Sequence, residues 1–452
     1  MTSSRVLAVD LGATSVRVAS VDLDEPDPEV DVLHRWHHAP VAGGDGSLRW
    51  DWPGIVEHVE LGLEMALESG PAASIGIDGW GVDYGLIDAE GELVDLPYSY
   101  RDSRTDGWGA IAERIGHHRL YEITGIQLMG INTIFQLAAE PADRLASARH
   151  ILLLPDLLVN HLTGWVGCEL SNMSTTGLMQ ARRHVWADEL IEALGMARSL
   201  FPQPASAATT VGSWRGIPVN LVGSHDTASA FMGVPFQPEV HSVFVSTGSW
   251  VIVGVERQEP DTSERARELN FSNEGGAMGG VRFLKNVVGF WILEQCREAW
   301  GDPSIEDLIR EASAVQGDVP TFDASDHRFV NTTDMLCEVT EAAGITDGAP
   351  RALVVRSIIE SIVAGVVRVI TEIAEVTGQP PEQAVLVGGG SRIPLVRDLL
   401  ARHFGKDVVV GSPEATALGN AIVQGVAIGH FADLTEARRW LPSSGVTARG
   451  TR

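Results

Sequence analysis

The stretch Val222–Ala230 combines residue types that could carry out acid–base chemistry. An apolar run ends in His225, Asp226 and Thr227, and small residues follow. This pattern predicts a β-strand that delivers a carboxylate to the first turn of a helix. Because a helix N-terminus carries free backbone N–H groups and a partial positive charge, an anionic or phosphorylated group can bind opposite Asp226. Asp226 is therefore a candidate general base, and helix capping is the structural alternative.

Two polar turns are candidates for binding phosphate groups. Residues 5–22 predict two strands joined by a glycine-containing turn, and residues 241–256 repeat that layout. The similarity between Val-Asp-Leu-Gly-Ala-Thr and Val-Ser-Thr-Gly-Ser is weak, but the repeated layout predicts a duplicated fold. The polar residues expected at the two tips are Asp10, Gly12, Thr14 and Ser15 in the first and Thr247, Gly248 and Ser249 in the second.

A third glycine-rich segment follows a predicted strand. Ala384–Arg392 reads as a strand that runs into Gly388, Gly389 and Gly390, with a helix from about residue 394. The glycines leave room for a flat ligand such as adenosine, although a tight turn without a ligand also explains them. Turn amides for phosphates, room for adenosine and one carboxylate base are what phosphoryl transfer from a nucleotide requires. In that chemistry Asp10 would face magnesium, directly or through water.

The elements that must position these residues alternate between helices and strands. Apolar residues near i+3 and i+4 predict a helix over 53–68, and a buried strand is expected over 74–78. A glycine-broken segment over 79–88 would let a ligand approach the backbone. A long amphipathic helix is expected over 351–375, and another helix opens near residue 415. The pattern indicates a mixed α/β protein.

The length of 452 residues exceeds one ordinary core, so we expect two lobes, residues 1–236 and 237–452. The formal net charge of −27 opposes nucleic-acid binding. It does not exclude a single nucleotide, because backbone N–H groups and a magnesium ion can neutralise its phosphates.

The sequence shows no pattern typical of a membrane helix, a signal region, a disulfide framework or a cysteine metal cluster. No apolar run approaches the ~18 residues of a membrane helix, so no membrane partner is expected. The N-terminus lacks a signal region, which predicts a cytoplasmic protein. The three cysteines fit neither a disulfide framework nor a cysteine metal cluster, so we expect reduced thiols.

In these motifs the chain resembles the FGGY family of carbohydrate kinases, within the actin and hexokinase (ribonuclease H-like) fold group. The resemblance covers nearly the whole sequence, and the Trp-Gly-Val-Asp and Tyr-Arg-Asp-Ser-Arg segments point to the rhamnulokinases within the family. The matching segments are Val9–Thr14, Gly76–Asp83, Tyr100–Thr105, Pro155–Leu157, Ser224–Ala230, Asn273–Gly276, Phe283–Trp291, Asp326–Asn331 and Val387–Gly390.

The resemblance implies two duplicated α/β lobes with a nucleotide and sugar cleft between them. Residues 1–236 would bind the sugar and residues 237–452 the nucleotide, with ATP as co-substrate and Mg²⁺ as cofactor. The ketose would contact Gly81, His225, Asp226 and Thr227, with Asp226 as the base and Asp10 at the metal. The residues implied for the nucleotide are Ala13, Thr14, Ser15, Val16, Arg17, Ser249, Asn286, Glu294 and Gly389.

The reaction implied is ATP-dependent phosphorylation of the C1 hydroxyl of L-rhamnulose, a step of L-rhamnose breakdown. Alternatives are a kinase for L-fuculose, D-xylulose, D-ribulose or glycerol, or a non-catalytic sugar or nucleotide sensor. Val16 and Glu294 stand where we expect glycine and glutamine in rhamnulokinases, and the chain is expected to lack their last C-terminal element. The oligomeric state stays open between monomer and homodimer.

Overall fold

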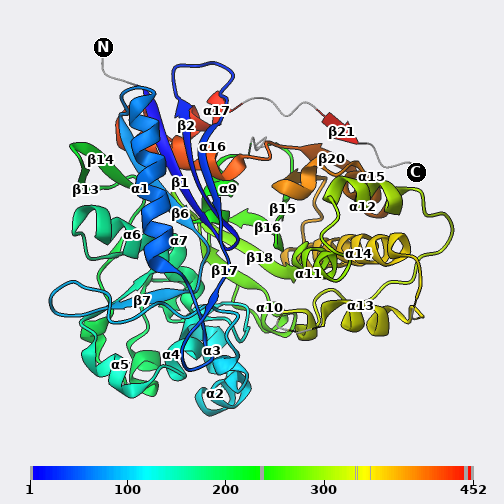
Figure 1. Ribbon diagram of the computed structural model, residues 1–452, viewed down its shortest axis with the longest axis horizontal. Coiled ribbons are helices and arrows are strands. Elements are labelled where there is room, and N and C mark those ends of the chain that lie inside the picture. Colours follow the sequence, from blue (N-terminus) through cyan, green and yellow to red (C-terminus); the bar gives the residue numbers. More distant parts are fainter. Residues whose placement is uncertain are drawn as a thin grey trace. The chain divides into compact units, whose positions relative to one another are not determined.

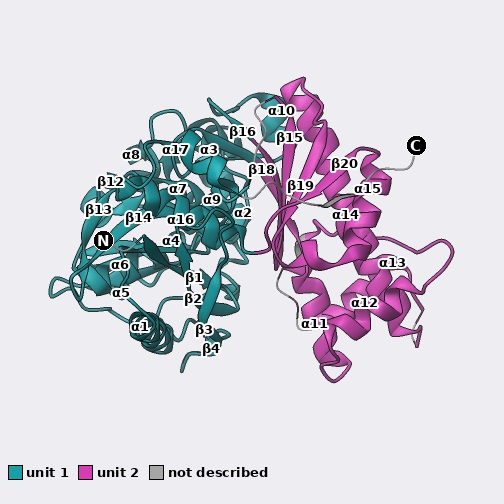
Figure 2. Cartoon of the chain, turned by 90° about the horizontal axis from the view of Figure 1, so that it is seen from above, with its two compact units in different colours: residues 1–235, 256–283, 414–442 teal, residues 236–255, 284–413, 443–452 magenta. Residues whose placement is uncertain are grey.

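The computed structural model describes residues 4–234, 239–330, 332, 334–346, 348–441 and 446–448. The chain forms two compact units, coloured separately in Figure 2. The first unit comprises residues 1–235, 256–283 and 414–442, and the second comprises residues 236–255, 284–413 and 443–452. The expected division gave each lobe one contiguous stretch, whereas the first compact unit takes up two later segments. The expected boundary at residue 236 and Asn331 of the resemblance lie outside the described residues.

The first unit is built on a six-stranded sheet with the strand order β13-β14-β6-β1-β2-β3. Strands β1 and β2 are antiparallel, β6 runs parallel to β1, and β14 runs parallel to β6. The carboxyl ends of β1, β6 and β14 therefore lie at the same edge of the sheet. The strands are β1 (Arg5–Gly12), β2 (Ser15–Asp22), β3 (Asp31–His37), β6 (Ser74–Gly79), β13 (Thr210–Trp214) and β14 (Ile217–His225).

Helices cover both faces of this sheet (Figure 1). Helix α1 (Trp52–Glu68) packs on one face, where Leu7 and Val9 of β1 share a core with Ile55 and Val59. Helices α9 (Asp226–Met232) and α16 (Ala415–Ala427) lie on the other face, where Val6 joins a second core with residues of α16. Neighbouring side chains of a strand point to opposite faces. Asp10 and Asp78 therefore point toward the α9 and α16 side.

The remaining elements of the first unit lie outside this sheet, and many of them share a separate apolar core, whereas α6 (Leu154–Thr163) packs into the core that faces α1 and α17 (Leu434–Trp440) into the core that contains α16. The strands are β4 (Val41–Ala42), β5 (Leu48–Arg49), β7 (Tyr84–Ile87), β8 (His150–Leu153), β9 (Cys168–Glu169), β10 (Met179–Gln180), β11 (Val185–Trp186), β12 (Pro204–Ala205) and β17 (Ser272–Gly275). The helices are η1 (Ser103–Thr105), α2 (Trp108–Ile115), α3 (His117–Thr124), α4 (Thr133–Ala138), α5 (Ala142–Ser147), α6 (Leu154–Thr163), α7 (Leu170–Met173), η2 (Ser174–Thr176), α8 (Asp188–Ala193), η3 (Arg198–Leu200), α10 (Glu264–Glu268) and α17 (Leu434–Trp440).

In the second unit the strands pair in the order β18-β16-β15-β19-β20-β21. The long helix α14 (Arg351–Thr377) is its central helix, and α11, α12, α13 and α15 pack against it. The strands are β15 (Ser242–Thr247), β16 (Trp250–Arg257), β18 (Val281–Val288), β19 (Gln383–Val387), β20 (Asp407–Val410) and β21 (Val446–Ala448). The other helices are α11 (Trp291–Ala299), α12 (Ile305–Ser313), η4 (His327–Phe329), α13 (Met335–Ala343), η5 (Gly389–Arg392) and α15 (Pro394–Phe404).

The two sheets repeat one topology. The order β3-β2-β1-β6-β14 in the first unit corresponds to β18-β16-β15-β19-β20 in the second. In both, the first two strands form an antiparallel hairpin, and the strand after the long helix lies parallel to the first. The predicted duplicated α/β fold is therefore confirmed.

Two smaller findings bear on the sequence-based expectations. None of the helices in the described part of the chain combines the length and apolar character needed to cross a bilayer. Cys168 and Cys296 are buried and Cys337 is exposed, and all three are free thiols. Cys296 is a fully buried residue of α11, which agrees with the expectation that it serves packing.

Candidate active site

Three aspartates lie at the carboxyl ends of three neighbouring strands. Asp10 of β1 and Asp78 of β6 are register partners, and Asp226 directly follows β14 as the first residue of α9. Asp10 and Asp78 are buried, whereas the Asp226 side chain is 33 % exposed. Burial raises the pKa of Asp78 well above its ordinary value, and the charges of Asp10 and Asp226 raise it further. Three carboxyl groups thus lie close enough at one edge of the sheet to affect one another's protonation.

Asp226 has the environment of a base and not of a helix cap. The capping position of α9 belongs to His225, and no side chain caps the helix. Thr227 Oγ1 donates a hydrogen bond of 3.0 Å to Asp226 Oδ1. Burial raises the pKa of Asp226, the His225 imidazole lowers it, and Asp10 raises it, with a net increase. A reachable carboxylate with raised proton affinity suits general-base catalysis.

Asp10 and Asp78 have the donor chemistry that magnesium requires. Arg17 forms ion pairs with Asp10 and, at 2.9 Å, with Glu414. Asp78 Oδ2 accepts a hydrogen bond of 2.6 Å from Asn420, whereas Asp78 Oδ1 is buried without a hydrogen-bond partner. Among the described residues no group of three or more His, Cys, Asp or Glu could by itself hold a metal ion. A magnesium ion bound by one or two carboxylates, phosphate oxygens and water fits this edge.

The turn after Asp10 is held by a neighbouring strand. The His38 N–H donates to Thr14 O at 3.1 Å, and His38 Nε2 lies 3.0 Å from Gly12 O. Thr14 is exposed, and Ala13 and Ser15 are half-buried. Val16 belongs to β2, and its side chain is fully buried in the core that faces α1. Val16 can therefore offer only its backbone to a nucleotide.

Gly81 lies in a strained turn between β6 and β7. Val82 has φ of +70°, a left-handed conformation that costs a β-branched residue energy and that the surrounding structure must hold. Thr133 Oγ1 donates to Val82 O at 2.6 Å, and Val82 N donates to Thr175 Oγ1 at 3.2 Å. A Cβ at Gly81 would lie only 3.0 Å from Thr175 Oγ1. The backbone of this turn is therefore fixed from two sides.

The side chain of Asp83 forms hydrogen bonds that hold the same turn in place. The sequence did not reveal this role. Its buried carboxylate accepts hydrogen bonds from Trp50 Nε1 at 2.6 Å, Trp80 Nε1 at 3.0 Å and Gln136 Nε2 at 2.9 Å. Burial raises the pKa of Asp83. Both indoles are buried, so these tryptophans belong to the core beneath the turn.

Glu274 and Arg282 are two further residues that sequence reasoning left without a role. They contact His225 although they lie about fifty positions along the chain from it, with the imidazole Nδ1 atom 3.2 Å from Glu274 Oε2 and 3.2 Å from Arg282 Nη2. Neither spacing nor periodicity could reveal this contact. Only the motif Asn-Glu-Gly-Gly singled out Glu274 in the sequence.

The second unit contains a pocket of about 600 Å³ beside the glycine triplet. A Cβ at Gly388, where φ is +82°, would lie 2.6 Å from Thr247 O, and one at Gly390 would lie 2.7 Å from Phe290. A Cβ at Gly389 would meet no atom within 4 Å. At Gly388 and Gly390 the absence of a side chain therefore lets the backbone pack closely against its neighbours, whereas Gly389 borders open space. The lining residues include Thr247, Gly248, Phe290, Leu293, Glu294, Ile305, Ile309, Arg310, Gly389, Gly390, Arg392 and Pro394.

Of the other residues predicted to bind the nucleotide in this unit, one lines the pocket and two do not. Glu294 lines it and forms an ion pair of 2.9 Å with Arg297. Ser249 and Asn286 are half-buried and do not line it. The Ser249 carbonyl accepts a 3.0 Å hydrogen bond from the Gly289 N–H, which joins the hairpin tip to the segment before α11.

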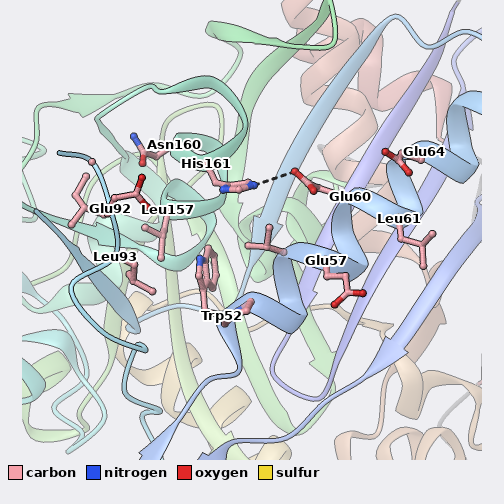
Figure 3. Close-up of a pocket in the computed structure, with 14 residues that line it drawn as sticks. Trp52, Glu57, Glu60, Leu61, Glu64, Glu92, Leu93, Leu157, Asn160 and His161 are labelled. Atoms are coloured by element: carbon pink, nitrogen blue, oxygen red, sulfur yellow. Dashed lines mark hydrogen bonds and ion pairs between the residues drawn. The ribbon is translucent and has the colours of Figure 1, made fainter.

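A different hollow of the first unit lies between α1 and α6 and is shown in Figure 3. It has a volume of about 620 Å³ and combines apolar residues such as Trp52 and Leu157 with several glutamates. Glu60 and His161 contact each other across it at 3.1 Å. None of the predicted site residues lines it, and it opens on the α1 side of the sheet, away from Asp10 and Asp78.

Solved structures with the same fold are sugar and polyol kinases. A ligand-bound xylulose kinase from Lactobacillus acidophilus superposes with a TM-score of 0.82 at 15 % identity, over 99 % of this chain and 94 % of that one. A glycerol kinase from Plasmodium falciparum with ADP superposes with a TM-score of 0.77 at 13 % identity, over the same shares. At these identities the likeness establishes the fold, which is the predicted two-lobed fold.

Relatives found by sequence are more similar to this chain than these solved structures are. Rhamnulokinase from Pectobacterium atrosepticum is 35 % identical over 98 % of this chain and 92 % of the relative. Rhamnulokinase from Bacteroides thetaiotaomicron is 35 % identical over 97 % of this chain and 93 % of the relative. Residues 5–233 match the N-terminal domain of the FGGY family of carbohydrate kinases, and residues 243–428 match its C-terminal domain. The chain belongs to the FGGY family of carbohydrate kinases.

Proposed function

We propose that this carbohydrate kinase transfers the γ-phosphoryl group of ATP to the C1 hydroxyl of L-rhamnulose, giving L-rhamnulose 1-phosphate and ADP. The observation that carries the proposal is Asp226, a reachable carboxylate with raised pKa at the end of β14. The choice of sugar is supported by the relatives named rhamnulokinase at 35 % identity over nearly the whole chain.

The proposed chemical step uses Asp226 as the base. Asp226 takes the proton of the C1 hydroxyl while that oxygen forms a bond to the γ-phosphorus. The bond between the γ-phosphorus and its bridging oxygen breaks, and ADP leaves with the electron pair. Such a transfer depends mainly on positioning and on neutralising charge. His225, Thr227 and the Gly81 turn are assigned to the sugar.

The phosphates and the nucleoside are assigned to other residues. The turn amides of residues 13–15 and the Arg17 guanidinium would neutralise phosphate charge. Magnesium would be held by Asp10, with Asp78 beside it, and when bound it neutralises phosphate charge. The pocket beside Gly389 has the volume and mixed polarity of a nucleoside site.

The test is ADP release from Mg-ATP by the purified protein, assayed in parallel with L-rhamnulose, L-fuculose, D-xylulose, D-ribulose and glycerol. We expect the highest kcat/KM for L-rhamnulose, and mass spectrometry and NMR of the product should show a C1 phosphate. A preference for another acceptor would contradict the choice of sugar and leave the kinase reaction intact. Nucleotide binding with no turnover on all five acceptors would favour the sensor alternative.

A further inference from the structure

Behind Asp226 lies a buried ionic cluster that the proposed reaction leaves unexplained. It consists of His225 at the end of β14, Glu274 of β17 and Arg282 of β18. Their exposed fractions are 8 %, 4 % and 1 %. A buried ion pair is costly to desolvate, and apolar residues of similar volume often stabilise a protein equally well or better. The position of this pair beside the base therefore calls for a role beyond stability.

The distances place the imidazole between the base and the ion pair. His225 Nε2 lies 3.5 Å from Asp226 Oδ1. On the other side of the ring, Arg282 Nη2 lies 3.2 Å from His225 Nδ1 in hydrogen-bond geometry. Arg282 Nη2 also lies 3.2 Å from Glu274 Oε2. A line of polar contacts thus runs from the base through the ring to the ion pair.

Two groups lie 3.2 Å from His225 Nδ1: Arg282 Nη2, in hydrogen-bond geometry, and Glu274 Oε2, without it. A guanidinium can only donate, so in a neutral ring the Nδ1 atom accepts from Arg282 and carries no proton. The ring proton of a neutral imidazole then lies on Nε2, toward the Asp226 carboxylate. Arg282 is itself anchored, because its Nε donates to Gly275 O at 3.0 Å.

Glu274 balances the charge of Arg282 in the core. Burial acts to raise the pKa of Glu274, but the Arg282 charge and the contact with His225 outweigh it, and the pKa is lowered. Glu274 Oε2 forms an ion pair with Arg282 Nη2 at 3.2 Å and also lies 3.2 Å from His225 Nδ1, and neither contact has hydrogen-bond geometry. Glu274 Oε1 accepts from Ser272 Oγ at 3.2 Å, which fixes the carboxylate.

The other groups around the ring are few. The backbone N–H of His225 donates to Ser171 Oγ at 3.2 Å. The charges of Glu169 and Asp226 act on Arg282, and those of His225 and Asp10 act on Asp226. The imidazole lowers the pKa of Asp226 and so favours its anionic form.

We propose that Arg282 and Glu274 are positioning residues for the reaction: they hold the His225 ring with its Nε2–H directed at Asp226, and so keep the base oriented toward the acceptor hydroxyl. This inference rests on the proposed function only in naming Asp226 as the base. It assigns His225 a second role besides sugar contact.

The test removes the ion pair without leaving a buried charge. In Arg282→Met with Glu274→Gln, we expect kcat to fall by about 10-fold to 10²-fold, as for a base displaced by a fraction of an ångström. KM for ATP should change by less than about two-fold, because the nucleotide pocket is untouched.

A matched control separates this role from the loss of a buried ion pair. Arg356 and Glu360 form a partly buried ion pair of 2.7 Å on α14, where their side chains are 11 % and 15 % exposed. Arg356→Met with Glu360→Gln should lower the thermal midpoint and leave kcat within about two-fold. A kcat loss in the Arg282 and Glu274 variant no larger than in this control would overturn the inference.

Two further measurements test whether Arg282 and Glu274 affect kcat through the His225 imidazole. In a His225→Gln background, removing the Arg282 and Glu274 pair should cause little additional loss of kcat, whereas independent effects would add. Nitrogen-15 NMR should show the Nε2–H tautomer of His225 in the native protein and its loss in the pair variant. Additive losses, or an unchanged tautomer, would overturn the inference.

The NMR measurement needs no substrate, so it keeps the two proposals separate. If the native protein turned over none of the five acceptors, the proposed function would fail, and the tautomer would still decide this inference. If the pair variant does not fold, Arg282→Gln with Glu274→Gln keeps polar side chains at both positions and replaces the donor-only group that faces Nδ1 with an amide, which can offer its oxygen. The same loss of the Nε2–H tautomer is expected there, and its persistence would contradict the inference.

Discussion

At the scale of single residues, the proposed reaction depends on one carboxylate and its neighbours. Asp226 could have been a helix cap, but the first turn of α9 uses no side-chain cap. Its raised pKa has burial as its largest cause, opposed by His225 and supported by Asp10. A single position in the fold thus combines partial exposure with a proton affinity suited to a base.

The pH dependence of turnover follows from this environment. The base acts as a carboxylate, so activity should be present above the pKa of Asp226 and be lost as the pH falls through it. Because that pKa is raised, the acid limb of kcat should lie above the range of an ordinary aspartate. A kcat–pH profile at saturating sugar and Mg-ATP measures it, and a limb at the ordinary aspartate value would contradict the assignment.

Removing the carboxylate should abolish most of the turnover. Asp226→Asn keeps the size of the side chain and should lower kcat by at least about 10²-fold, the usual contribution of a general base. Isothermal titration calorimetry should still detect nucleotide binding, since the substitution leaves the pocket beside Gly389 and the turn of residues 13–15 unchanged. Near-normal kcat in this variant would show that another group takes the proton.

At the scale of elements, strand ends and glycines shape the two candidate ligand sites. Parallel pairing of β1, β6 and β14 brings Asp10, Asp78 and Asp226 to one edge. In the second unit, β19 ends at a glycine triplet whose members have different surroundings. The triplet was predicted either to admit a ligand or to make a tight turn. Gly388 and Gly390 lie in close contact with neighbouring residues, and Gly389 faces open space.

Two glycine substitutions distinguish these roles. Gly389→Val places its side chain in the open pocket, so KM for ATP should rise by about ten-fold while the thermal midpoint stays unchanged. Gly390→Ala places a methyl group against Phe290 and Thr247 and should destabilise the protein by about 1–3 kcal/mol. Steady-state kinetics and thermal denaturation of both variants check this. Equal effects of the two substitutions on KM would contradict a nucleoside site beside Gly389.

At the scale of the whole molecule, the first compact unit is completed by a segment from the end of the chain. Helix α16 supplies Asn420, which donates to the buried Asp78 carboxylate. It also supplies Gln424, which accepts a hydrogen bond of 2.6 Å from Ser74. Its apolar side chains complete a core with Val6 and Val21. The contiguous N-terminal stretch is therefore only part of a folded unit.

A fragment tests this organisation. Residues 1–236 alone would expose the face of β1 and β6 that α16 covers and would leave Asp78 without Asn420. We expect the fragment to lack cooperative urea unfolding and to bind a hydrophobic dye, whereas the full chain should unfold cooperatively. A fragment with a cooperative transition and native-like near-UV circular dichroism would contradict the prediction.

Local patterns were sufficient to predict several helices and strands and to single out the proposed base. The hairpins over 5–22 and 241–256 and the helices over 53–68 and 351–375 correspond to β1–β2, β15–β16, α1 and α14. Their periodicity is set by which face of each element is apolar, and this can be read from residues close in the chain. The same holds for Asp226, because the transition from strand to helix lies within a few residues.

Contacts between distant segments could not be read in this way. The pairing of Asp10 with Asp78 depends on strand register, and the return of α16 to the first unit depends on packing between residues hundreds of positions apart. The contact of Glu274 and Arg282 with His225, and the open side of Gly389, likewise exist only after the strands have paired. Periodicity shows which side of an element is buried but not which partner buries it. The proposed base could therefore be picked out in the sequence, whereas the groups that contact His225 could not.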